Sequence, residues 1–236
     1  MDLPQICAWI CRHHVRAAGV LDALDTELLA ASNCYFGGGT AIALRYGEYC
    51  ESVDVGFLVS DSSGYSSIRE NVRGPEGFNA LTRRPIAVLR PVVTDQYGIR
   101  TLLDVDGQPI EFEIIFEGRI SLQPPGPDDR MCGLATLTAL DTATGKLLAN
   151  SDRWADPTVF SRDAIDLAMM EPGADLLNRA IAEAEAAYRS AIVDDLTRAV
   201  DYLRDNPHRL DDCMLALRMY DTPKAVLWDR IKRLRR

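Results

Sequence analysis

Three consecutive glycines followed by a threonine constrain this chain more than any other feature of its sequence. Gly37, Gly38 and Gly39 stand before Thr40 and the helix-forming residues AIALRY. Backbone N–H groups at a helix N-terminus attract anions, and the missing side chains let an anion come close. A glycine triplet also suits a plain tight turn. On its own, the triplet leaves both interpretations open.

A short predicted strand over residues 52–59 follows the glycines and carries Asp54. Side chains alternate along a strand, so Asp54 and residue 56 share one face. A carboxylate in an apolar strand is costly to bury unless it binds a metal or a cation. Metal-dependent phosphoryl transfer would favour a second acid at position 56, where this chain has Gly56.

A third element, IEFEII, places two more carboxylates on a strand. Glu111 and Glu113 alternate with apolar residues and therefore share one face. An antiparallel strand with one solvated face explains the same pattern. Glu113 is accordingly either a functional acid or a surface residue of the sheet.

Composition limits the class of protein. The 236 residues are 47% hydrophobic and 26% charged, which is typical of a folded globular protein. No apolar run is long enough to cross a membrane, and the N-terminus lacks the basic region and the unbroken apolar stretch of a signal peptide. We therefore expect a cytoplasmic protein without a membrane partner. The net charge of −9 argues against a surface that follows nucleic acid throughout. The six cysteines lack the spacing of a zinc site and are expected to be reduced thiols.

The predicted elements divide into an α/β part and a helical part. We expect residues 1–137 to form a mixed β-sheet with flanking helices and residues 138–236 to form a helical C-terminal domain. Asp106-Gly107 is a strong hairpin signal between two of the strands. The predicted helices before the proline cluster at 124–127 cover residues 3–31 and 40–46, with one or two turns within 61–81, and the predicted strands cover 52–59, 86–93, 99–105 and 110–116. Beyond that cluster everything is predicted to be helical, including a long apolar stripe over 174–206.

Four sequence blocks together resemble a known family. GGTAIALRYG, ESVDVGFLVS, IEFEII and GKLLAN with DRWADPTVFSRDAIDL are similar to the AbiEii/AbiGii toxin family. These bacterial nucleotidyltransferases of abortive-infection and toxin–antitoxin systems belong to the superfamily related to DNA polymerase beta. The resemblance covers roughly residues 30–170. It implies a nucleotidyltransferase-type α/β fold.

The resemblance also implies a reaction and its site. A nucleoside monophosphate would pass from an NTP, with Mg2+ or Mn2+, to an RNA such as tRNA or to a protein hydroxyl. The expected partners are the NTP, the RNA acceptor and a cognate antitoxin protein. By resemblance, the nucleotide-binding residues are Gly38, Gly39, Thr40 and Lys146, the metal ligands are Asp54 and Glu113, and the catalytic residues are Asp54, Glu113 and Asp163.

Each assignment has an alternative. Lys146 is otherwise a surface lysine, and Asp163 with Asp166 otherwise pairs with Arg153 or Arg162. Because Gly56 replaces a family acid, the chain is alternatively a catalytically silent or inactivated relative that binds nucleotide or a partner protein. A nucleotidyltransferase that modifies a small-molecule antibiotic needs the same residues and differs only in its acceptor pocket.

Overall fold

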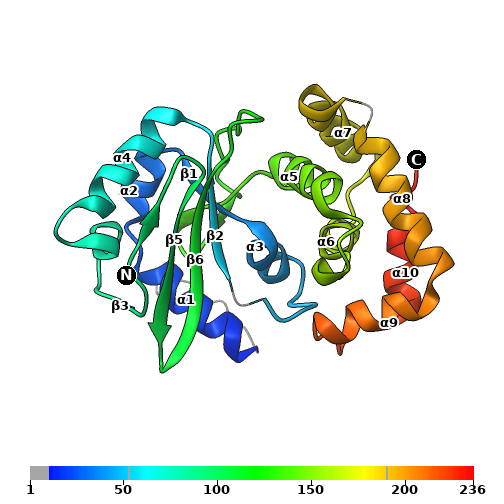
Figure 1. The fold of residues 1–236 in the computed structure, drawn as a ribbon, viewed down its shortest axis with the longest axis horizontal. Coiled ribbons are helices and arrows are strands. Elements are labelled where there is room, and N and C mark those ends of the chain that lie inside the picture. The colour runs from blue at the N-terminus through cyan, green and yellow to red at the C-terminus, as the bar shows by residue number, and fades with distance from the viewer. Residues whose placement is uncertain (1–10, 53, 190) are drawn as a thin grey trace. The chain divides into compact units, whose positions relative to one another are not determined.

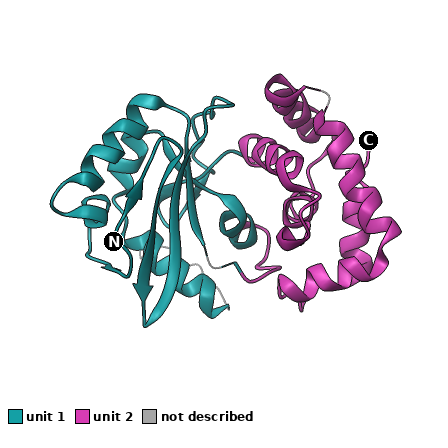
Figure 2. Ribbon diagram, in the orientation of Figure 1, with its two compact units in different colours: residues 1–44, 52–138 teal, residues 45–51, 139–236 magenta. Residues whose placement is uncertain are grey.

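The computed structural model describes residues 11–52, 54–189 and 191–236. Residues 3–10 of the first predicted helix, with Cys7, lie outside the described residues. The chain forms two compact units (Figure 2), one of residues 1–44 and 52–138 and the other of residues 45–51 and 139–236. Among the helices of the described residues, none is long and apolar enough to span a membrane.

The first unit is built on a mixed β-sheet (Figure 1). Its strand order is β1-β2-β6-β5-β3, and β4 also pairs with β5. The β2–β6 pair is parallel and the other pairs are antiparallel. The predicted fold class, a mixed sheet with flanking helices, is confirmed. The sheet strands are β1 (Cys34–Gly37), β2 (Val55–Val59), β3 (Ala87–Val88), β4 (Val93–Thr94), β5 (Gly98–Val105) and β6 (Gln108–Phe116).

Alternation along β6 separates the core from the outer face of this sheet. Ile110, Phe112 and Ile114 are buried, whereas Glu111 and Glu113 are not. The core also takes apolar side chains from the helices of this unit. These elements are α1 (Arg12–Ala23), α2 (Thr26–Ala31), α3 (Gly38–Arg45), α4 (Ser62–Arg73) and the 3-10 helix η1 (Gly77–Leu81). The carboxylates of β6 therefore stand on the face opposite the apolar core.

The hairpin predicted at Asp106-Gly107 is confirmed. Val105 pairs with Gln108, and both turn residues have positive φ, 54° at Asp106 and 73° at Gly107. Two successive positive φ values are what a type I′ hairpin turn requires.

Several elements differ from the sequence expectation. β1 was not predicted, because four residues that are all buried show no alternation. The stretch 61–81 holds the twelve-residue helix α4 and then η1, where only one or two helical turns were expected. Asp61 caps the serine-rich start of α4 by accepting N–H groups of Ser63 and Gly64. The strand predicted over 86–93 is two short pieces, β3 and β4. A small hairpin of β7 (Arg130–Met131) and β8 (Leu134–Ala135) follows the prolines, where only helix was expected.

The second unit is helical. The predicted stripe over 174–206 is two helices, because the chain changes direction at Arg189, where φ is 59°. Leu177 and Leu196 of these helices are buried, and both helices pack against α5. The helices are α5 (Ala139–Arg153), α6 (Arg162–Met169), α7 (Ala174–Tyr188), α8 (Ala191–Asp205), α9 (Pro207–Ala216) and α10 (Lys224–Lys232), with a short 3-10 helix η2 (Pro157–Val159).

Residues 45–51 belong to this helical unit although they follow α3 in sequence. The Tyr49 hydroxyl donates a hydrogen bond to Asp166 at 2.6 Å. The N–H of Glu51 donates to the Leu217 carbonyl at 3.1 Å, and its carboxylate pairs with Arg218. These bonds join the segment to α6 and to the end of α9.

Candidate functional site

Strand register places the key positions of the first unit in one row. Gly37 of β1 pairs with Gly56 of β2, Gly56 pairs with Glu113 of β6, and Glu113 pairs with Arg100 of β5. We call these four residues the cross-strand row. Asp54 lies two residues before Gly56 and is exposed, as expected on the face opposite buried Val55.

The glycine turn begins at the first residue of this row. A side chain at Gly37 would meet Leu137 Cδ1 at 2.5 Å, so only glycine fits there without a shift. Gly38 has a φ of 76°, in the region that favours glycine, and opens α3 together with Gly39. The turn therefore presents the N-terminus of an eight-residue helix directly beside position 56.

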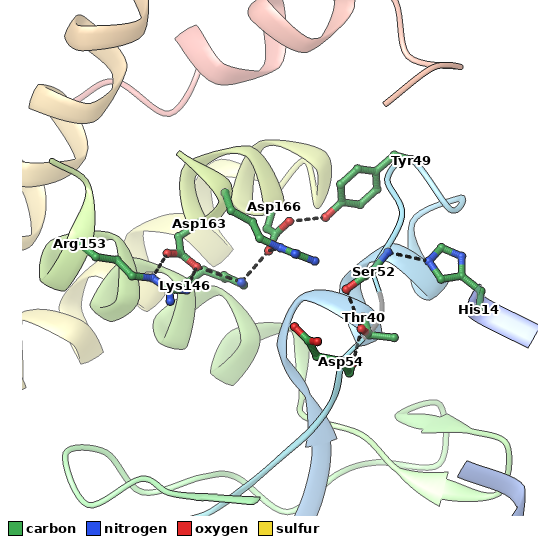
Figure 3. Close-up of polar contacts among 10 residues, drawn as sticks. His14, Thr40, Tyr49, Ser52, Asp54, Lys146, Arg153, Asp163 and Asp166 are labelled. Carbon is green, nitrogen blue, oxygen red and sulfur yellow. Dashed lines mark hydrogen bonds and ion pairs between the residues drawn. The ribbon is translucent and has the colours of Figure 1, made fainter. Parts of the chain in front are cut away.

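Thr40 makes contacts that sequence reasoning did not anticipate. It is buried, and its hydroxyl donates to the Asp54 carbonyl while lying 2.7 Å from the Ser52 hydroxyl. Since its one proton goes to Asp54, the Ser52 hydroxyl must be the donor between the two. The Ser52 N–H in turn donates to His14 Nε2 at 3.3 Å (Figure 3). The Thr40 hydroxyl thus holds the approach to β2 in place, and with it Asp54.

Position 56 has room for a larger residue. A Cβ built on Gly56 meets only the Gly37 carbonyl oxygen, at 3.6 Å, which is an ordinary contact. The φ of Gly56 is not positive, so the backbone conformation does not require glycine there. Packing therefore does not require glycine at position 56.

Glu113 is engaged by its neighbour in the row. Arg100 Nε donates to Glu113 Oε1 at 2.9 Å, and Arg100 also pairs with Asp95 at 3.2 Å. Both Arg100 and Glu113 are partly exposed, so the pair contributes little to stability. Its main effect is on the site, because it places a positive charge against one of the two carboxylates expected to bind metal.

These residues do not form a ready metal site. Across the described ranges, no group of three or more His, Cys, Asp or Glu side chains is placed to hold a metal ion. Mg2+, however, commonly takes one or two carboxylates and completes its shell with substrate phosphates and water. Asp54 and Glu113 supply the number of carboxylates that this second arrangement needs, in which the ion arrives with a nucleotide.

The second unit holds a separate cluster of charges between α5 and α6 (Figure 3). Lys146 is buried, with Nζ 3.0 Å from Asp163 Oδ1 and 2.6 Å from Asp166 Oδ2. Arg153 binds both oxygens of Asp163, at 2.7 and 2.9 Å. Arg162 lies 3.7 Å from Asp166. Three cations thus surround two carboxylates, which leaves one positive charge in excess.

The charge states of this cluster follow from its contacts. Burial alone would lower the pKa of Lys146, but Asp166 and Asp163 outweigh burial and raise it. Burial likewise opposes the charged form of Asp163, yet Lys146 and Arg153 hold its pKa below the usual value. Burial and the nearby Asp166 carboxylate raise the pKa of Tyr49. Lys146 is therefore a cation and Asp163 an anion at neutral pH.

The structure thus groups the sequence-predicted residues within each unit. Gly38, Gly39, Thr40, Asp54 and Glu113 gather around the cross-strand row, and Lys146 lies with Asp163. The alternative of a surface lysine is wrong, because Lys146 is buried in the middle of α5. Ion pairing of Asp163 and Asp166 with arginines, the other alternative, is observed alongside the contacts to Lys146.

Two contributors escaped sequence reasoning. Tyr49 bonds Asp166 across 117 residues of sequence, and no local pattern signals such a contact. In the sequence, Arg100 is indistinguishable from any charged residue on the solvent-exposed face of an alternating strand. Its position opposite Glu113 could have been inferred from the Asp106-Gly107 hairpin, since that turn sets the register of β5 and β6.

Comparison with solved structures identifies the class of fold. A candidate nucleotidyltransferase from H. pylori matches with a TM-score of 0.50 and 14% identity, covering 94% of this chain and 92% of that one. JHP933 from Helicobacter pylori matches with a TM-score of 0.52 and 14% identity, covering 96% and 93%. At this identity the likeness concerns the fold. No curated protein matches the chain.

Comparison with protein families then places the sequence. The family model of the nucleotidyl transferase AbiEii toxin of type IV toxin–antitoxin systems matches residues 20–233. The chain belongs to this family.

Proposed function

We propose that this protein transfers a nucleoside monophosphate from an NTP to an RNA acceptor, tRNA included, and acts as the toxin of a toxin–antitoxin pair with a cognate antitoxin protein. The observation that carries the proposal is the cross-strand row. Three features lie on adjacent strands in this row. They are the glycine turn that follows β1, Asp54 just before β2, and Glu113 on β6. Family membership supports the class of reaction.

Each residue of the first unit has a part in this proposal. The backbone N–H groups at Gly38 and Gly39 would bind the NTP phosphates, because the N-terminus of α3 carries partial positive charge. Asp54 and Glu113 would ligate Mg2+ or Mn2+, which supplies charge neutralisation for the phosphates. Thr40 stays among the residues proposed to bind the nucleotide, and its hydroxyl also holds the Asp54 backbone.

By the family resemblance, Lys146 would be the cation that meets the triphosphate. It keeps its proton because two carboxylates stabilise the charged form, and the cluster around it has more cations than anions. A polyphosphate would complement that excess. Asp163 holds Lys146 and Arg153 in position by ion pairs, so we assign it a positioning part in the proposed reaction.

The proposed reaction is a displacement at the α-phosphorus of the NTP. An acceptor hydroxyl oxygen attacks the α-phosphorus, and a new P–O bond forms. The bond from that phosphorus to the oxygen bridging the α- and β-phosphates breaks, and pyrophosphate leaves. The hydroxyl proton passes to the Glu113 carboxylate, which stands in the row beside position 56.

Gly56 leaves this site one carboxylate short. Fewer anionic ligands weaken metal binding, so nucleotide binding should outlast catalysis. This observation favours a second candidate function, a catalytically silent relative that still binds nucleotide. The same residues would serve a transferase for small antibiotics, which differs in the acceptor.

One experiment separates these functions. The protein and its Gly56→Asp variant are incubated with each labelled NTP, Mg2+ and either total RNA, protein extract or an aminoglycoside. Label on RNA that is lost in Asp54→Asn and Glu113→Gln variants supports the proposal. Binding of nucleotide by both forms, with no label transferred to any acceptor, supports the silent relative. Label on the aminoglycoside alone supports the antibiotic-modifying enzyme.

A further inference from the structure

A cavity of about 630 Å³ lies on the first unit beside Glu113. We call it the Tyr97 pocket and define it by Tyr97, Arg100, Glu113, Ile115, Glu117 and Arg119. Glu113 therefore belongs both to the cross-strand row and to the wall of this pocket. The proposed reaction gives no role to the pocket or to its two arginines.

Its location follows from the order of the row. The glycine turn, which suits the NTP phosphates, is at the β1 end, and position 56 and Glu113 follow on β2 and β6. Arg100 on β5 comes next and borders the pocket. An acceptor hydroxyl must approach the α-phosphate from the side opposite the leaving pyrophosphate. The pocket lies at the end of the row remote from the glycine turn, which is the side an acceptor needs.

The pocket has the chemistry of a nucleotide site. Tyr97 is 64% exposed, so its aromatic ring is accessible for stacking. Arg100 uses Nε and one Nη1 donor on Glu113 and Asp95, and a guanidinium has five N–H donors in all. Donors therefore remain for a phosphate oxygen. Arg119 is held by both oxygens of buried Glu117.

A cationic acceptor would fit less well. Both carboxylates that line the pocket, Glu113 and Glu117, are already ion-paired with its arginines. An incoming amine would have to displace a guanidinium, whereas a phosphate can add to Arg100. Counting Asp95, three carboxylates face two guanidiniums, so the pocket has no excess of positive charge. What it offers an aromatic ligand with a phosphate is the Tyr97 ring and the remaining donors of Arg100.

We propose that the Tyr97 pocket binds the 3′ end of a single-stranded RNA acceptor, with a base stacked on Tyr97 and a phosphate held by Arg100. This inference rests on the proposed nucleotidyl transfer for its meaning, because the pocket would present the 3′ hydroxyl to Glu113. RNA binding itself can be measured without any reaction.

The test measures binding of a short single-stranded oligoribonucleotide, labelled at its 5′ end, by fluorescence anisotropy without NTP. Tyr97→Ser should weaken binding about tenfold, equivalent to about 1.4 kcal/mol, whereas Tyr97→Phe retains the ring and should bind as the wild type does. Arg100→Gln should reduce the slope of log affinity against log salt by about 0.7, as expected for one lost phosphate contact on a single strand.

Two matched variants control for general effects. Tyr220→Ser removes another exposed tyrosine, and Arg84→Gln removes another exposed arginine, which pairs with Asp22 of α1. Both should bind RNA as the wild type does. Thermal midpoints of all variants show whether each one is folded.

The two proposals fail in different ways. RNA that does not bind, or that binds equally to wild type, Tyr97→Ser and Arg100→Gln, overturns the pocket assignment. The pocket assignment is also overturned if the Gly56→Asp variant labels RNA and adding Tyr97→Ser to it leaves the KM for RNA unchanged. Absence of label transfer to any acceptor, with RNA binding sensitive to Tyr97, would instead overturn the proposed reaction and leave the pocket as an RNA site.

Discussion

Gly56 pairs directly with Glu113 across the parallel strands β2 and β6. Position 56, where the family resemblance predicts a second strand acid, therefore lies beside the acid that we propose accepts the acceptor's proton. On the other side of Gly56 is Gly37, whose neighbours open α3. Any carboxylate introduced at residue 56 would consequently stand between the glycine turn and Glu113.

We predict that Gly56→Asp raises Mg2+-dependent transfer about tenfold or more, equivalent to about 1.4 kcal/mol of transition-state stabilisation. The added side chain meets only an ordinary contact with the Gly37 carbonyl, so the fold should accept it. Initial rates over a Mg2+ titration measure the effect. Gly56→Asn, similar in size but uncharged, should stay at the level of the wild type. Equal rates for the Asp and Asn variants would show that charge at this position is irrelevant.

Removing the Thr40 hydroxyl should destabilise the protein even without a nucleotide. Thr40→Val deprives the Asp54 carbonyl and the Ser52 hydroxyl of a partner, and we expect a loss of about 1 to 3 kcal/mol in the free energy of unfolding. Thr40→Ser keeps the hydroxyl and should lose less. Urea unfolding of the three proteins checks this. A Val variant as stable as the wild type would mean that the hydroxyl matters only when a phosphate is bound.

The ion pairs of Asp163 should make stability depend on pH in the acid range. Its folded-state pKa lies below its ordinary value of 3.8, so its contribution is present above that pH and is lost as the pH falls further. Asp163→Asn leaves Lys146 and Arg153 without this partner and should cost about 3 to 5 kcal/mol at neutral pH.

The difference between wild type and Asp163→Asn should therefore narrow as the pH falls below about 4, where the wild-type carboxyl is also protonated. Thermal or urea unfolding of both proteins over a pH series gives the comparison. Asp175→Asn is a suitable control, because the Asp175 side chain is 91% exposed and its contact with Arg179 is long, at 4.0 Å. A gap between wild type and Asp163→Asn that stays constant with pH would contradict the assignment.

Leu196→Ala should reduce the free energy of unfolding by about 2 to 5 kcal/mol, because Leu196 is fully buried and a cavity would remain. Leu215 is 69% exposed, and the same change there should alter stability by no more than about 0.5 kcal/mol. Guanidinium unfolding of both variants tests the pair. If the two variants prove equally stable, α8 does not pack as described.

The sequence by itself determined the class of fold and the local chemistry. Strand alternation put Glu111 and Glu113 on one face, Asp106-Gly107 specified a hairpin, and the glycine triplet marked the start of α3. Each of these depends on residues close together in the chain, where side-chain direction follows from backbone period. The apolar stripe beyond residue 174 could also be predicted from its helical period, whereas the break of the helix at Arg189 could not.

Only the tertiary structure decided which of these residues meet. The row from Gly37 through Gly56 and Glu113 to Arg100 depends on strand pairings between distant segments, and a shift of one residue would turn every side chain to the other face. The burial of Lys146 with two aspartates depends on the packing of α6 against α5. The hydrogen bond from the Thr40 hydroxyl to the Asp54 carbonyl likewise joins residues 14 apart in the sequence. Long-range contacts of this kind have no period in the sequence.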